Sequence, residues 1–388
     1  MQYKEFALII VIFIALLASC ETDEKNDCIA INLVNPELSK YKLSDICDSL
    51  FYIPLKSDYG IRYLNEIQMD DSIIFCATQP EGILAFNFKG QFLKRIGKRG
   101  RGPGEYQTGI RFCLDKMANY IYVDNGMGKI LKFNYQGDLL KEIEIKTKVS
   151  PGFIDFADNF FVFSYPIVTS TIKTPYQWII TDSLSNMVSQ KSNDNYIFHN
   201  NGPTPSGELT YMFNNKIHYW NHYNDTIFQI TSKNLQPKYI LDKGKMGPSP
   251  EKLSNLIRFN DIRDYIIIRK IIECSNFLFI IYYFQNQREI VMFDKYKKIS
   301  YNIKSAHSID AEFTNDIDGG LNFLPFKSTD SLTLVMPIDV YKITQIGKTI
   351  DFKNSTPKHP EKKKELVQLA NSLNENDNPV LMMVKLKD

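Results

Sequence analysis

Two heptapeptides decide the fold of this 388-residue chain: Ala85-Phe86-Asn87-Phe88-Lys89-Gly90-Gln91 and Lys132-Phe133-Asn134-Tyr135-Gln136-Gly137-Asp138. Each contains Phe-Asn, then an aromatic residue, then a glycine, and each lies between short runs of strand-forming residues. They begin roughly 47 residues apart, which is within the range for one four-stranded blade of a β-propeller. The sequence therefore predicts an all-β propeller.

Short apolar runs continue along the chain, separated by turn residues and with little helical periodicity. Segments rich in Gly and Pro punctuate them, as at Gly102-Pro103-Gly104-Glu105, where we expect the glutamate to accept hydrogen bonds from its own turn. Similar joints occur at 202–208 and 247–251. Counting the strand groups predicts six blades; the later groups are 160–165 with 177–181, 216–220 with 226–230, and 277–284 with 289–293.

The end of the chain is expected to close the ring. Pro360 suits the first turn of a predicted helix over 360–373, and a last strand is predicted over 379–386. Because an open sheet edge invites association, we pair this strand with residues 50–55, so that Phe51 and Val384 share one sheet. The helix would then be a short insertion in the last blade. Two β-sandwich domains are the alternative architecture, and they would not need matched ends.

The N-terminus reads as an export signal. Lys4 precedes an apolar run over 6–17, which is shorter than the ~20 residues of a membrane-spanning helix. The run ends in Leu17-Ala18-Ser19-Cys20, which resembles the lipobox of bacterial lipoproteins, where the cysteine receives the lipid. The alternative is an apolar N-terminus that ends in this tetrapeptide by chance. We expect a lipoprotein signal peptide over 1–19, a lipidated polar tether over 20–40 and a single six-bladed propeller over 41–388.

The predicted tether begins with the acidic segment 21–27. This segment is either a flexible spacer or a signal similar to those that send some lipoproteins to the outer leaflet. The expected location is therefore the outer membrane, with the propeller periplasmic or surface-exposed. Cys28 and Cys47 could form a disulfide in such an oxidising compartment, although nothing in the sequence requires one.

Composition and charge exclude several classes of protein. Hydrophobic residues make up 44% of the chain, which is too many for a disordered protein. The 46 basic and 44 acidic side chains leave a net charge of only +2, so the electrostatic signature of a nucleic-acid binder is missing. No nucleic-acid partner is expected.

A resemblance to a known family follows from the repeat. The segments 96–106, 120–124 and 130–133 look like an NHL-type propeller repeat. The mature chain as a whole resembles the six-bladed β-propeller lipoproteins of anaerobic Gram-negative bacteria, in particular at 223–228, 315–320 and 375–381. The resemblance implies a fold and an envelope location. Most members of that family are uncharacterised, so the resemblance implies no catalytic residues.

One candidate ligand site is the basic loop between Gly97 and Gly104. Guanidinium and ammonium groups beside backbone N–H groups could hold an anion or the carboxylate of a glycan. The alternative is a tight connection between blades with solvated side chains. The loop lacks the Gly-Lys-Ser/Thr ending of a nucleotide-binding P-loop. The candidate ligand-binding residues here are Lys98, Arg99, Arg101 and Glu105.

A second candidate consists of His218, Trp220 and His222, which would share one face of a strand because side chains alternate with period two. They could form an aromatic wall for a saccharide, or could simply pack against the neighbouring strand. Two histidines four residues apart on a strand lie ~13 Å apart, which is too far to chelate one metal ion directly. We predict no metal site here.

No linear catalytic motif is present: the chain lacks Gly-X-Ser-X-Gly and His-Glu-X-X-His. We predict no cofactor, although a structural Ca²⁺ is not excluded; the segment 315–320 shows too few oxygen ligands by itself. The leading hypothesis is a lipid-anchored binding module for a glycan, peptide or envelope protein. The alternative is a lyase or hydrolase with a site at the central channel. A structural part of an outer-membrane assembly is a third hypothesis.

Overall fold

The computed structural model describes residues 28–107, 111–146, 151–165, 175–194, 209–232, 234–249, 262–305 and 309–388, together with two short strands at 168–169 and 197–198. The predicted signal peptide, Cys20 and the joint at 202–208 lie outside these residues, as does part of the joint at 247–251. Within the described chain no helix is both long enough and apolar enough to cross a membrane.

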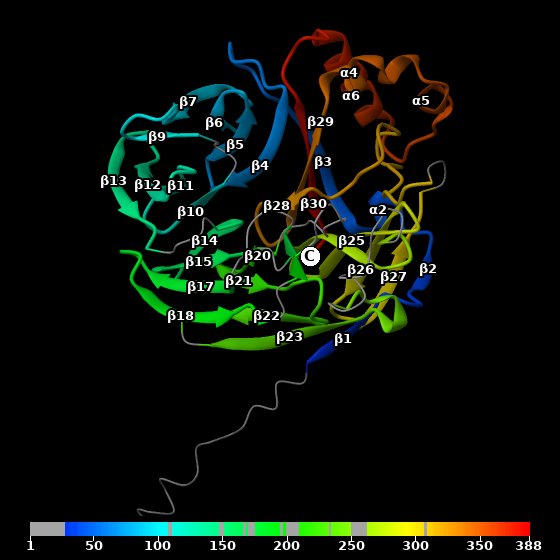
Figure 1. Cartoon of the computed structure of the whole chain (residues 1–388). Coiled ribbons are helices and arrows are strands. Elements are labelled where there is room, and N and C mark those ends of the chain that lie inside the picture. The colour runs from blue at the N-terminus through cyan, green and yellow to red at the C-terminus, as the bar shows by residue number, and fades with distance from the viewer. Residues whose placement is uncertain are drawn as a thin grey trace, which may run out of the picture.

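Six antiparallel sheets surround a central axis, as Figure 1 shows, so the predicted six-bladed propeller is confirmed. The first three blades are β4 (Tyr63–Met69), β5 (Ile73–Gln79), β6 (Gly82–Asn87) and β7 (Phe92–Ile96); β10 (Phe112–Asp115), β11 (Tyr120–Asp124), β12 (Lys129–Asn134) and β13 (Leu139–Glu144); and β14 (Phe153–Ala157), β15 (Phe160–Ser164), β17 (Tyr176–Asp182) and β18 (Met187–Ser192). Two further two-stranded pairs lie outside the blades: β8 (Lys98–Arg99) with β9 (Glu105–Tyr106), and β16 (Val168–Thr169) with β19 (Ile197–Phe198).

The remaining three blades follow in chain order. They are β20 (Thr210–Phe213), β21 (Lys216–Tyr219), β22 (Thr226–Ile230) and β23 (Leu235–Asp242), followed by the single turn η1 (Gly244–Met246); β24 (Ile267–Glu273), β25 (Phe277–Phe284), β26 (Gln287–Asp294) and β27 (Ile299–Ile303); and β28 (Lys327–Ser328), β29 (Thr333–Ile338), β30 (Val380–Leu386) and β3 (Cys47–Pro54). The first-named strand of each blade is the innermost.

The repeated heptapeptide forms the hairpin between the third and fourth strands of a blade. In blade 1 the Asn87 side chain accepts hydrogen bonds from the backbone N–H of Lys89 (2.9 Å) and Gln91 (3.0 Å). Gly90 has φ +75°, a left-handed conformation that favours glycine, and a Cβ there would lie 2.0 Å from the carbonyl oxygen of Pro54. Asp182 makes the same turn in blade 3, where it accepts from Leu184 and Asn186. The repeat is therefore a local turn motif.

Blade 6 closes the ring with strands from both ends of the chain. Strand β30 pairs with β3 in antiparallel register, with Leu50 opposite Val384 and Phe51 opposite Met383. The predicted closure is confirmed, and the two-sandwich alternative is wrong. Asn378 reinforces the closure, because its side-chain oxygen accepts from the N–H of Ile61 (2.8 Å) while its amide donates to the carbonyl of Tyr59 (3.0 Å).

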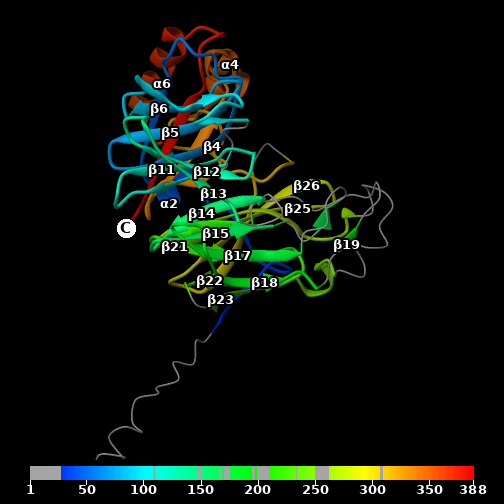
Figure 2. The same cartoon turned by 60° about the vertical axis from the view of Figure 1, so that its left-hand side comes forward.

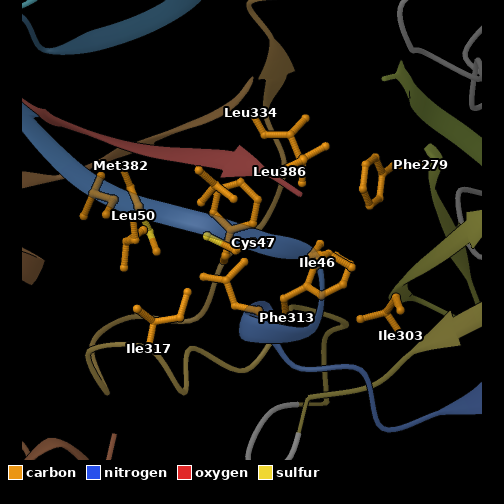
Figure 3. Packing of buried hydrophobic residues seen from close by; sticks show 14 of the residues in the cluster. Ile46, Cys47, Leu50, Phe279, Ile303, Phe313, Ile317, Leu334, Met382 and Leu386 are labelled. Carbon is orange, nitrogen blue, oxygen red and sulfur yellow. The ribbon is translucent and has the colours of Figure 1, made fainter. Parts of the chain in front are cut away.

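The chain between β29 and β30 forms a helical insertion, in which α6 confirms the predicted helix over 360–373 and the other helices were not predicted. It contains α4 (Val340–Gln345), η3 (Ile346–Lys348), α5 (Ile350–Asn354) and α6 (Pro360–Ser372), and these lie at the outer rim of blade 6 in Figure 1. Leu366 and Ala370 of α6 pack into the largest apolar cluster, which joins blades 5 and 6. Figure 3 shows part of this cluster, in which Ile46 of the short α2 (Leu43–Ile46) lies near Phe313 and Ile303.

The propeller begins earlier in the chain than the sequence indicated. Residues 29–39 were expected in the tether, but β1 (Ile29–Asn32) pairs in parallel with β23, and β2 (Glu37–Ser39) pairs in parallel with β27. Each adds a fifth strand to the outer edge of a blade, where it covers backbone groups that would otherwise be unpaired. Two strands of three or four residues give too short a pattern to recognise in a sequence.

The five cysteines in the described part of the chain are free thiols. Cys28 and Cys47 therefore form no disulfide, which answers the question that the sequence left open. Burial raises the pKa of the Cys47 thiol to about 12, so this group is a poor nucleophile. Cys76 and Cys113 are buried in strands β5 and β10.

Candidate functional site

The innermost strands of all six blades end on one face of the propeller, which we call the mouth face. It is formed by the hairpins that join the first strand to the second in each blade and the third to the fourth in blades 1 to 5. The chain ends here too: in Figure 2 the C-terminus lies on the left, with α2 beside it. A cavity of about 230 Å³ opens at this face among the ends of β4, β10, β14, β20, β24 and β28.

The cavity wall combines aromatic, amide and hydroxyl groups. Phe213 and Phe326 supply aromatic surface, and the hairpins at 214–215 and 328–331 supply side-chain amides and hydroxyls. Asn214 and Asn215 both have positive φ, because they turn the chain from β20 into β21. The site is thus assembled from tight turns on a rigid ring, which is the usual way in which a propeller presents polar groups.

Charged side chains near the cavity are tied to the neighbouring blade. Lys327 of blade 6 forms an ion pair with Glu66 of blade 1. Burial lowers the pKa of Lys327 to about 8, while the adjacent carboxylate favours the protonated ammonium. Asp155 of blade 3 accepts a hydrogen bond from the hydroxyl of Thr210 in blade 4 (2.5 Å). Each pair therefore links the innermost strands of two neighbouring blades.

The joint between blades 4 and 5 contains a buried carboxylate, Glu273, which is only 3% exposed. Its two oxygens accept hydrogen bonds from the hydroxyls of Tyr211 (2.9 Å) and Tyr239 (2.8 Å), and the Lys295 ammonium lies 2.5 Å from one of them. A buried charge is stable only when it is paired and hydrogen-bonded in this way. Burial and the Glu273 charge together raise the pKa of Tyr211 far above its usual range.

The three remaining joints are also bridged by polar side chains. Gln68 of blade 1 donates to the carbonyl of Phe112 in blade 2 (2.7 Å). Arg111, at the start of blade 2, donates to the carbonyl of Pro151 at the start of blade 3 (2.6 Å). Lys270 of blade 5 donates to the carbonyl of Phe326 in blade 6 (3.0 Å). A side-chain bond therefore crosses every boundary between neighbouring blades.

The basic loop is organised by its own glutamate. Glu105 accepts from the N–H of Gly102 (2.8 Å) and pairs with Lys98 (2.9 Å), and these contacts lower the pKa of its carboxyl group. The expected bond between the glutamate and its turn is confirmed. Arg99 donates to the carbonyl of Gln107 (3.0 Å), and Arg101 is exposed. The structure brings Lys98 and Glu105 together as an ion pair and places this loop outside the cavity.

The histidine and tryptophan residues do not share one face of a strand, because β21 ends at Tyr219 and the chain turns after it. His218 stacks on Tyr211 (4.8 Å between ring centroids), and His222 lies edge-on to Trp220 (5.1 Å). All three are buried, with exposed fractions of 2%, 1% and 7% for His218, Trp220 and His222. They form no exposed wall, and ligand binding by them stays a prediction.

Sequence reasoning missed the residues that line or border the cavity. Glu66 and Asp155 lie within innermost strands and Glu273 ends one, and a carboxylate at these positions is the one signal that could have indicated them. Among the described residues no group of three or more His, Cys, Asp or Glu side chains is placed to hold a metal ion.

Comparison with known proteins identifies the family. Residues 28–385 match the model of a domain of unknown function, DUF4934, so the chain belongs to the DUF4934 family. No curated protein matches the chain. Among solved structures, a Bacteroides fragilis NCTC 9343 protein predicted to be exported is similar at a TM-score of 0.71 and 19% identity, over 93% of this chain and 100% of that one.

A second solved structure, a protein of unknown function from Bacteroides thetaiotaomicron VPI-5482, aligns with a TM-score of 0.45 and 7% identity. That alignment covers 88% of this chain and 74% of that one. At 19% identity the comparison with the Bacteroides fragilis structure bears on the fold alone, and the second comparison carries no argument.

Proposed function

We propose that this chain is an exported envelope protein, anchored at the outer membrane by a lipid on Cys20, that binds a ligand in the cavity of the mouth face. The lipobox-like segment before Cys20 supports the anchor. The similar Bacteroides fragilis protein, which is predicted to be exported, agrees with an envelope location. The propeller would face either the periplasm or the cell exterior.

The observation that carries the binding role is the composition of the cavity wall. Phe213 and Phe326 line the same wall as the amides at 214–215 and the hydroxyls at 328–331. Aromatic rings contact the C–H face of a sugar, while amides and hydroxyls bond its hydroxyl groups. The ligand proposed from this chemistry is the end of a glycan, one or two sugar units in size.

The carboxylates of the wall favour binding over hydrolysis. Asp155 is bonded to Thr210 and Glu273 to two tyrosines and a lysine, so both are used to hold neighbouring blades together. The third carboxylate of the wall, Asp330, accepts from the N–H groups of Leu332 and Thr333 (both 2.7 Å) in its own hairpin. A general acid or base needs a proton-accepting atom that can reach the substrate. A lyase or hydrolase at the channel is therefore the less favoured function.

The test is to fill the cavity. Ser328 lies in the wall, and Ser328→Trp would place an indole where the ligand is expected. The wild-type chain should bind a set of glycans on an array, and the variant should bind the best of them at least tenfold more weakly in calorimetry. Ser372→Trp, at the exposed end of α6, is the matched control and should bind normally. Equal affinity in Ser328→Trp, or an array without any hit, would overturn the proposal.

A further inference from the structure

Two lysines line the cavity of the mouth face, and they differ in how their charge is balanced. The ammonium of Lys327 forms an ion pair with Glu66 of blade 1. Lys116 lies in the exposed hairpin that follows β10. Its ammonium donates to the backbone carbonyl of Thr329 (3.3 Å) and forms an ion pair with no carboxylate of the described chain. The positive charge of Lys116 is therefore left for a group that comes from outside the chain.

The carboxylates around Lys116 already have hydrogen-bond donors of their own. Glu273 is bonded to two tyrosines and a lysine, and Asp155 is bonded to a threonine hydroxyl. Asp330 and Asp115 each accept from backbone N–H groups of their own hairpins. Because each of these carboxylates is held by other donors, none of them neutralises the Lys116 ammonium at close range.

The bond to Thr329 places this charge beside the polar part of the cavity wall. Thr329 belongs to the segment 328–331, whose hydroxyls are expected to bond the sugar. Lys116 reaches this segment of blade 6 from blade 2, past the intervening blade 1. An ammonium has three N–H donors, and the carbonyl of Thr329 uses one, so two remain for a ligand. A sugar bonded at 328–331 would therefore lie next to an unneutralised positive charge.

We propose that the ligand of the cavity is an acidic glycan end, in which the terminal sugar carries a carboxylate or a sulfate group, and that Lys116 binds this anionic group. The proposal rests on the proposed function and narrows its ligand from any glycan end to an acidic one. A lysine ammonium is a mobile point charge without a fixed planar geometry, so it suits either anion. Because Lys116 is exposed, salt screens the pair, and we expect it to contribute about fivefold in affinity.

Three forms of the same glycan test this preference: one with a neutral terminal sugar, one with a carboxylate and one with a sulfate. In calorimetry at about 50 mM salt, the wild-type chain should bind at least one acidic form about fivefold more tightly than the neutral form. At about 500 mM salt the difference should shrink to less than about twofold, because the Debye length falls. Comparison of the two acidic forms shows which anionic group is preferred.

A charge-removing variant assigns the preference to one residue. Lys116→Met keeps most of the length of the side chain and removes the ammonium, so the acidic and neutral forms should bind it with equal affinity. Lys141→Met, at an exposed position of β13 in the same blade and outside the cavity wall, is the matched control and should keep the wild-type preference.

Two results would overturn the acidic ligand and leave glycan binding in the cavity standing. One is a wild-type chain that binds the neutral form as tightly as both acidic forms at low salt. The other is a preference for the acidic form that persists in Lys116→Met. If the wild-type chain bound none of the three forms and no other glycan of the array, the proposed function would be overturned together with this inference.

Discussion

Blades 4 and 6 both bury polar side chains, but they treat them differently. In the closure region of blade 6, Asp318 is fully buried and accepts from the Tyr52 hydroxyl (2.7 Å), the Asn315 amide (2.6 Å) and the N–H of Gly320 (2.8 Å). In blade 4, four buried polar atoms lack a hydrogen-bond partner: His218 Nδ1, Trp220 Nε1, His222 Nε2 and the Tyr223 hydroxyl. Asp318 is stabilised by its donors, whereas these four groups of blade 4 are tolerated only while they are uncharged.

The two blades should respond to acid in opposite directions. Burial raises the pKa of Asp318, so its native state takes up a proton more readily than the unfolded chain and gains stability as the pH falls. Burial lowers the pKa of His218 to about 4 and that of His222 to about 3, with Lys243 and Arg269 also lowering the latter. Acid therefore destabilises the native state through the two histidines of blade 4.

The largest expected effect is this acid sensitivity. Histidines in the unfolded chain take up protons below about pH 6.5. The contribution of the two neutral histidines to the free energy of unfolding is therefore fully present above that pH, and it is lost as the pH falls toward their pKa values in the folded state. Between pH 7 and pH 5 the free energy of unfolding should fall by about 2 kcal/mol for each of His218 and His222. Urea denaturation at the two pH values measures it.

A double variant sharpens this prediction. His218→Gln with His222→Leu should remove most of the difference between pH 7 and pH 5, while His359→Leu, at an exposed site before α6, should keep it. An undiminished pH dependence in the double variant would show that other groups cause the loss.

The next effect concerns the closure of blade 6. Asn378→Leu removes the acceptor of the Ile61 N–H and two donors to the half-buried groups at Ser57 and Tyr59. The buried Ile61 N–H is then left without a partner, whereas the Ser57 hydroxyl still donates to the Tyr59 carbonyl. The free energy of unfolding should fall by about 3 kcal/mol, since a buried N–H is left unsatisfied and two further bonds are lost with it. Asn376→Leu, at an exposed position two residues earlier, is the control and should change stability by less than about 0.5 kcal/mol. Equal losses in the two variants would contradict the comparison.

A smaller effect is expected at the joint between blades 4 and 5. Tyr211→Phe removes a hydrogen bond to the buried Glu273 and keeps the ring that stacks on His218. We expect a loss of about 2 kcal/mol in thermal or urea unfolding, the usual value for a bond to a charged group. Tyr341→Phe, on the exposed side of α4, should leave stability unchanged. An unaffected Tyr211→Phe would mean that Tyr239 and Lys295 alone satisfy the carboxylate.

The smallest effect is expected in the basic loop. Arg101 is exposed, and Glu105 organises the turn without it, so Arg101→Ala should change the free energy of unfolding by less than about 0.5 kcal/mol. A loss above 1 kcal/mol would reveal a structural role for the guanidinium. Chemical denaturation alongside the wild-type chain decides between the two outcomes.

The features that could be predicted from the sequence are those formed by residues close together in the chain. Asn87 bonds to backbone groups only two and four residues away, so a sequence of seven residues is enough to predict the hairpin. The insertion was also predictable, because Pro360 and the apolar face of α6 are local signals. Closure of the ring was predicted because an unpaired sheet edge invites association, and the pairing of Leu50 with Val384 confirmed it.

The cavity could not be predicted, because its parts meet only in the finished ring. Lys327 contacts Glu66 across 261 residues of sequence, and no periodicity connects them. The error at His218, Trp220 and His222 has a different cause: period-two alternation holds only inside a strand, and β21 ends at Tyr219. In the same way, β1 and β2 are too short to show the alternation that identifies an edge strand.

The pairing of β3 with β30 has a consequence for biosynthesis. Strand β3 leaves the ribosome early, whereas its partner β30 begins only at Val380, so one flank of β3 stays unsatisfied until β30 has been made. A product of termination before β30 would lack this sheet partner and expose that flank. Quality-control proteases recognise exposed segments of this kind, and only chains that extend through β30 would escape them.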